Sequence, residues 1–108
     1  MENKPLADSD LLLLLEKKLS LLEELLQLSN QQITTNEMLL WEPIFQKKDD
    51  CIENLQRIDA LIETWSRQRK RELQSKEILC LQRIKKTLEH IQTAEQLFEE
   101  KVKTYDRY

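Results

Sequence analysis

Apolar residues recur three and four positions apart over most of this chain, which is the spacing of one face of an α-helix. The chain also has no glycine, the residue that tight hairpin turns and phosphate-binding loops most often need. The pattern therefore predicts an almost entirely helical protein without a glycine-rich nucleotide site. The apolar positions include Leu12, Leu15, Leu19, Leu22 and Leu26 early in the chain, and Leu88, Ile91, Phe98, Val102 and Tyr105 late in it.

The first helix is expected at about residues 9–33. Acidic and hydroxyl side chains at 8–10 suit a helix N-terminus, because they accept hydrogen bonds from its unpaired N–H groups and match its dipole. The weak helix formers at 34–36 then favour a break. Pro43 lacks the N–H that a helix interior needs, so we expect it as the first residue of the second helix.

The second and third helices are expected at about 43–68 and 76–105, each with one apolar face. The stretch 66–75 is polar and basic but holds no helix breaker, so the sequence leaves open whether it is a turn or continuous helix. One domain covering residues 1–108 is expected for a chain of this length. The predicted fold is all-α: a three-helix antiparallel bundle or an extended helical hairpin, either as a monomer or as a dimer.

The first helix has more apolar surface than one core-facing stripe requires. Its leucines cover an arc of about 200°, whereas a single stripe needs little more than about 100°. It is either a central helix covered on two sides or a helix whose second face receives a partner's amphipathic helix. Our binding hypothesis takes the second interpretation; if this face is core, the binding face moves to the second and third helices. The second face consists of Leu14, Leu21, Leu25 and Leu28.

Few residues suit catalysis or metal binding. His90 is the one histidine, and Cys51 and Cys80 form no CxxC pair, so we expect no metal, no cofactor and two buried thiols. Adjacent glutamates point about 100° apart on a helix and have no nucleophile or second base beside them. The protein is therefore not expected to be an enzyme.

The net charge of −3 hides an uneven distribution. Residues 1–63 carry 6 basic and 13 acidic side chains, whereas residues 64–108 carry 11 and 7. This asymmetry fits an antiparallel fold-back and fits a dimer equally well. The basic cluster at 67–71 beside Trp65 is flanked by glutamates, so we interpret it as a solvated bend and expect no nucleic-acid partner.

No membrane insertion is expected. The longest apolar run, Leu11 to Leu15, is far shorter than the roughly 20 residues that span a bilayer. Acidic residues precede this run, where a secretion signal carries basic ones. The sequence therefore predicts a cytoplasmic location.

A leucine-rich first helix thus leads through a short polar break to a tryptophan at the start of a charged second helix. With this arrangement, the stretch from Leu22 to Ile58 resembles the bacterial flagellar export chaperones of the filament-cap type, which are related to the hook-filament junction chaperone. The segment 78–105 resembles the third helix of that family. The junction residues are Trp41, Pro43, Ile44 and Phe45.

The resemblance implies a chaperone that binds an amphipathic helix of a flagellar or type III secretion subunit. Its partner would be a filament-cap or hook-junction protein, which it would keep unassembled and deliver to the export gate and its ATPase. Family members contact the gate through a tyrosine near the C-terminus, for which Tyr105 and Tyr108 are candidates. The alternative is a structural protein, a homodimeric coiled coil or helical bundle whose surplus apolar arc is the dimer seam.

Overall fold

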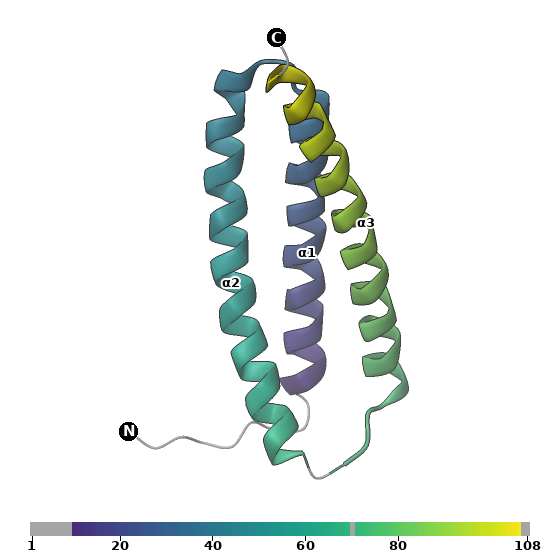
Figure 1. Cartoon of the computed structure of the whole chain (residues 1–108). Coiled ribbons are helices and arrows are strands. Elements are labelled where there is room, and N and C mark those ends of the chain that lie inside the picture. The colour runs from purple at the N-terminus through teal and green to yellow at the C-terminus, as the bar shows by residue number, and fades with distance from the viewer. Residues whose placement is uncertain (1–9, 70, 107–108) are drawn as a thin grey trace, which may run out of the picture.

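The computed structural model describes residues 10–69 and 71–106, and helices make up nearly all of this range (Figure 1). The structure is 91% helical, which confirms the all-α prediction. A short 3-10 turn, η1, stands directly before the second helix. The elements are α1 (Asp10–Thr34), η1 (Met38–Leu40), α2 (Trp41–Gln68) and α3 (Ser75–Asp106).

The central helix is α1, with α2 and α3 packed on either side of it (Figure 1). The chain direction alternates from helix to helix, so α2 is antiparallel to α1 whereas α3 runs parallel to α1. Within the described residues, no Cα atom of α2 comes within 8 Å of one in α3. The molecule is correspondingly flat, with extents of 57 × 33 × 16 Å. It is a three-helix bundle that is open on the side between α2 and α3.

The core lies where α1 meets its two neighbours. Leucines from both apolar faces of α1 are buried in it, so the surplus arc of this helix is largely used for packing. Cys51 and Cys80 are free and buried, as predicted, and burial raises the pKa of both thiols. The core residues include Leu11, Leu15, Leu22, Leu25 and Leu28 of α1, Leu55 and Trp65 of α2, and Ile84 and Ile91 of α3.

The predicted helix boundaries agree with the structure to within two residues. The largest difference is at α2, which begins at Trp41 and not at Pro43. Pro43 is the third residue of the helix, still in the first turn, where the N–H groups have no intrahelical acceptor and proline is therefore tolerated. Residues 69 and 71–74 are not helical, so the chain turns between α2 and α3.

A buried ion pair fixes the start of α3. The Glu77 carboxylate, 1% exposed, accepts two hydrogen bonds of 2.8 Å from the Arg71 guanidinium and one of 2.7 Å from the Gln74 backbone N–H. The guanidinium also lies 5.2 Å from the ring centre of Trp65. The predicted solvent exposure is therefore right for Arg67, whose side chain is 77% exposed, although this residue lies in α2 and not in a bend. The prediction is wrong for Arg71, which a carboxylate and an aromatic ring hold in the fold, and Lys70 lies outside the described residues.

Lys101 of α3 closes the C-terminal end of α1. Its Nζ donates to the backbone oxygen atoms of Ile33 and Thr35 and to Oδ1 of Asn36. The last turn of α1 has no basic residue of its own. Lys101 therefore supplies the positive charge and the donors that a helix C-terminus favours.

A Lys101→Met variant should lose about 1 kcal/mol of unfolding free energy, because the last carbonyl groups of α1 lose a charged donor. For a domain of this size, that loss lowers the melting temperature by about 4 °C or more. Thermal unfolding followed by circular dichroism measures the change. The matched control is Lys103→Met, because Lys103 lies two residues after Lys101 in α3 and its side chain is exposed. Equal destabilisation by the two variants would contradict the capping role.

Candidate functional site

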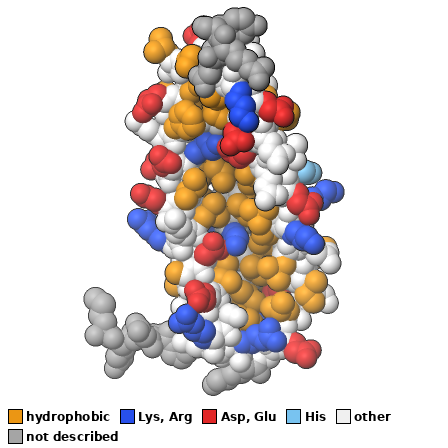
Figure 2. Space-filling model, viewed as in Figure 1, with side chains coloured by type: hydrophobic (Ala, Val, Ile, Leu, Met, Phe, Trp, Pro, Cys, Tyr) orange, Lys and Arg blue, Asp and Glu red, His pale blue; other side chains and the backbone are white. Residues whose placement is uncertain are grey.

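An apolar groove runs along the open side of the bundle, between α2 and α3 (Figure 2). Figure 2 shows a band of apolar side chains along the length of this face, with charged side chains on both edges. A cavity lies toward each end of the groove. The aromatic pocket, about 500 Å³, is lined by Trp41, Phe45, Phe98, Glu99, Val102 and Lys103. The Trp65 pocket, about 170 Å³, is lined by Leu11, Leu15, Ile62, Trp65, Ser66, Arg69, Leu73 and Leu81.

Phe45 lines the aromatic pocket from α2, and Leu81 lines the Trp65 pocket from α3. Seven residues return to within about 20° of the same direction on a helix, so the residue seven positions after each of them extends the same wall of the groove. On α2, Ile52 follows Phe45 by seven residues, and on α3, Leu88 follows Leu81 by seven. All four side chains are between 38% and 42% exposed. Each wall therefore offers apolar surface that the three helices do not cover. We call these four residues the wall residues.

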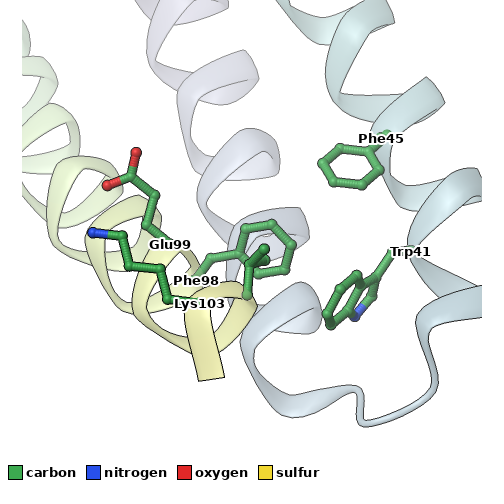
Figure 3. A pocket seen from close by; sticks show the side chains of 6 residues that line it. Trp41, Phe45, Phe98, Glu99 and Lys103 are labelled. Carbon is green, nitrogen blue, oxygen red and sulfur yellow. The ribbon is translucent and has the colours of Figure 1, made fainter. Parts of the chain in front are cut away.

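Three aromatic rings from α2 and α3 meet in the aromatic pocket (Figure 3). The ring of Phe98 contacts Trp41 edge-on at 4.9 Å between centroids and Phe45 at 5.9 Å. Trp41 is fixed in addition by a 3.1 Å hydrogen bond from Nε1 to the backbone oxygen of Thr35. Figure 3 shows the charged ends of Glu99 and Lys103 pointing away from the rings. The result is a preformed apolar recess with a charged rim.

A polar network links all three helices below the aromatic pocket. Lys48 Nζ lies 2.5 Å from Oε1 of Glu95 and donates to Oε1 of Gln32 at 2.8 Å, while the Ser29 hydroxyl donates to the same Glu95 oxygen at 2.7 Å. Partial burial raises the pKa of Glu95, but the hydrogen bonds from Lys48 and Ser29 and the charge of Lys48 outweigh it, so the net shift is downward. Glu95 is therefore ionised at neutral pH and neutralises Lys48.

The four leucines predicted to bind a partner do not lie in this groove. Leu14, Leu25 and Leu28 are at most 8% exposed, and Leu21 is partly buried against the core. The expectation that this arc of α1 is open to a partner is therefore wrong. The reason is that α2 covers it: Leu21 borders a cavity with Ile58 and other residues of α2. The half-exposed apolar residues at the groove lie on α2 and α3, the helices expected to carry the binding face if these leucines are core.

The junction residues have different roles. Trp41 and Phe45 line the aromatic pocket, Ile44 packs against the core, and Pro43 is exposed in the first turn of α2. The side chain of Tyr105 and the whole of Tyr108, the predicted gate contacts, lie outside the described residues.

No motif in the sequence distinguished Ile52 and Leu88 from the other apolar residues of their helices. A search for apolar residues seven positions apart would have identified Ile52 and Leu88, because this spacing places them on the same side of the helix as Phe45 and Leu81. All four are half-exposed and lie beside more deeply buried residues. Phe98 and Val102 were assigned to the apolar face of the third helix. Their position opposite Trp41 depends on how α3 packs against α1, which one-helix periodicity does not specify.

Two chemical features are absent from the part of the chain that the structure describes. No three histidine, cysteine or acidic side chains there are grouped as a metal site requires. No helix in this part of the chain carries the extended apolar stretch that a membrane span requires. Comparison of the chain with models of protein families, with curated proteins and with solved structures finds no match.

Proposed function

We propose that the protein is a cytoplasmic export chaperone that binds an amphipathic helix of a flagellar or type III secretion subunit in the groove between α2 and α3. The observation that carries this proposal is the half-exposed apolar side chains on both walls of the groove. Packed helices lie with their axes 8–10 Å apart. Because α2 and α3 both pack on α1 but not on each other, there is room for a fourth helix between them. A bound helix would complete a four-helix arrangement.

A filament-cap or hook-junction protein is the kind of partner that needs such a groove. A subunit that assembles through an apolar helix aggregates when that helix is free, and a groove that covers the apolar face prevents this reversibly. The proposed chaperone would hold the subunit unassembled and deliver it to the export gate and its ATPase. Binding and release need no chemical step, which suits a groove of apolar walls and charged edges.

The wall residues provide the test. In an Ile52→Ser/Leu88→Ser variant, each substitution should cost about 1 kcal/mol of binding, because roughly half of each side chain remains to be covered by the partner. We therefore expect a loss of affinity of about thirtyfold. The measurement is fluorescence anisotropy with labelled peptides that span the amphipathic terminal helices of the cap and hook-junction subunits.

Leu61→Ser/Leu97→Ser is the matched control. Leu61 and Leu97 are 43% and 49% exposed, and each lies nine residues, or about 180° around its helix, from the corresponding wall residue. Their loss should leave affinity within about twofold of the wild type. An equal loss in both double variants would contradict groove binding. If the wild type is instead a tight dimer by light scattering, and Ile52→Ser/Leu88→Ser dissociates it, the groove is a homodimer seam and the structural alternative is correct.

A further inference from the structure

In the folded chain, acidic and basic side chains are concentrated at opposite ends of the bundle, and not on different helices. The end that carries the α1–α2 connection and the aromatic pocket is acidic, with 10 acidic and 4 basic side chains in residues 23–54 and 90–104. The opposite end is basic, with 7 acidic and 10 basic side chains in residues 10–22, 55–69 and 71–89. The groove runs from the acidic end to the basic one.

Acidic side chains dominate the groove edge around the aromatic pocket. Glu42 and Asp49 stand three residues before and four residues after Phe45, so they share its side of α2. Both are exposed, and Glu99 lines the pocket from α3. Lys103 is the one opposing charge on the pocket lining. The nearby Lys48 is neutralised by its ion pair with Glu95 and adds no net charge.

Basic side chains dominate the edge at the Trp65 pocket. Arg69 lines this pocket, and the exposed Lys85 stands four residues after Leu81, on the same side of α3. The other charged side chains near this half of the groove are largely paired with one another. These pairs are Lys18 with Asp59, Arg67 with Glu63, and Arg71 with Glu77. Arg69 and Lys85 therefore give this edge of the groove a positive charge.

We propose that the groove accepts an amphipathic partner helix in one direction: its N-terminal half basic and at the aromatic pocket, its C-terminal half acidic and at the Trp65 pocket. This inference rests on the proposed function and specifies the partner. Opposite charges along the two edges match this direction, and the partial positive charge of a helix N-terminus adds to the attraction at the acidic end. The bound helix would then run parallel to α2 and antiparallel to α1 and α3.

The shape of the groove favours a single helix over a second copy of the chain. A helix presents one apolar ridge, which fills a hollow between two helices. A second copy would present its own hollow, with α2 and α3 as two ridges. The largest apolar side chain of the partner's ridge would occupy the aromatic pocket, where Phe45 is still 41% exposed.

Two synthetic helices of identical composition test the direction. Each has about 24 residues, roughly 36 Å of helix, with a leucine and phenylalanine stripe. In the polarised peptide, lysines flank the N-terminal half of the stripe and glutamates the C-terminal half; in the mixed peptide, the two alternate. We expect the polarised peptide to bind about tenfold more tightly at low salt, and the advantage to disappear near 1 M salt, where the Debye length is about 3 Å.

Charge reversal on the groove edge should abolish the preference. Asp49→Lys/Glu99→Lys places positive charge beside the aromatic pocket, and we expect the tenfold advantage to be lost. The matched control is Asp50→Lys/Glu100→Lys, in which each change lies one residue further along, or about 100° around the helix. A nitroxide on the N-terminus of the polarised peptide should broaden NMR signals near Phe98 and leave those near Leu81 sharp.

The possible outcomes distinguish an error in the proposed direction of the partner helix from an error in the proposed function. Equal affinities for the two peptides, or a preference that survives Asp49→Lys/Glu99→Lys, would overturn the proposed direction and leave apolar docking intact. Broadening near Leu81 in place of Phe98 would reverse it. Failure of both peptides and of the subunit helices to bind would overturn the proposed function as well. A dimer that both peptides fail to displace would make a second copy the occupant.

Discussion

A Glu77→Gln variant is expected to lose about 3 kcal/mol of unfolding free energy, a large part of the 5–15 kcal/mol typical of a small domain. The carboxylate is 1% exposed and is the charge partner of Arg71, whose side chain is 21% exposed. A neutral amide cannot balance the guanidinium or accept its two parallel hydrogen bonds equally well. The start of α3 and the packing of Arg71 on Trp65 both depend on this contact.

Urea unfolding at neutral pH measures the loss. Glu72→Gln is the matched control, because Glu72 is exposed and accepts a hydrogen bond from Arg71 through its backbone oxygen, which the substitution keeps. Its unfolding free energy should stay within about 0.5 kcal/mol of the wild type. Equal losses in the two variants would show that the ion pair with Glu77 adds no stability of its own.

The pH dependence gives a second test of the same contact. Hydrogen bonds from Arg71, together with the one from Gln74 and the charge of Arg71, lower the pKa of Glu77 against the opposing effect of burial. Since the folded pKa lies below the unfolded value of about 4.3, the contribution to stability is fully present above that pH and is lost as the pH falls through the folded pKa. The difference between wild type and Glu77→Gln should therefore narrow below about pH 4. A difference that stays constant from pH 7 to pH 3 would contradict the assignment.

The helices were predictable because their signals are local. Periodic leucines, the weak helix formers at 34–36 and Pro43 lie within a few residues of the boundaries they set, and the predicted boundaries agree with the structure to within two residues. The cap of α1 was not predictable in this way. Its donor, Lys101, lies 66 residues after Thr35 in the chain, and only the packing of α3 on α1 brings the two together.

The groove was predictable in part. The tryptophan junction drew attention to Trp41 and Phe45, which line the aromatic pocket, whereas the leucine arc of α1 that was expected to face a partner is largely buried in the core. Burial of Leu25 depends on where α2 lies, and a helical-wheel argument contains no such information. The charge distribution was likewise only partly predictable. The two halves of the sequence differ in the sign of their net charge, but folding brings residues 90–104 beside residues 23–54. The acidic and basic regions of the structure therefore lie at opposite ends of the bundle.

In the polar network beside the aromatic pocket, replacing Glu95 alone is expected to lower the free energy of unfolding, whereas replacing both Lys48 and Glu95 is not. Glu95→Ala alone should cost about 3 kcal/mol, because it leaves the Lys48 ammonium, whose side chain is 10% exposed, without its counter-charge and removes the acceptor of the buried Ser29 hydroxyl. This value is at the low end for a buried pair, since the Glu95 side chain is 43% exposed and water reaches it.

The double variant Lys48→Met/Glu95→Leu replaces both charges with apolar side chains of similar size. It removes the desolvation cost of both ions, so its unfolding free energy should equal that of the wild type or exceed it by about 1 kcal/mol or more. Urea unfolding of the two variants, with Lys47→Met as an exposed control, measures the contrast. If the double variant is as unstable as Glu95→Ala, the network determines how the three helices pack. If it is stable, the network adds little net stability, because the attraction between the two charges only offsets their desolvation cost.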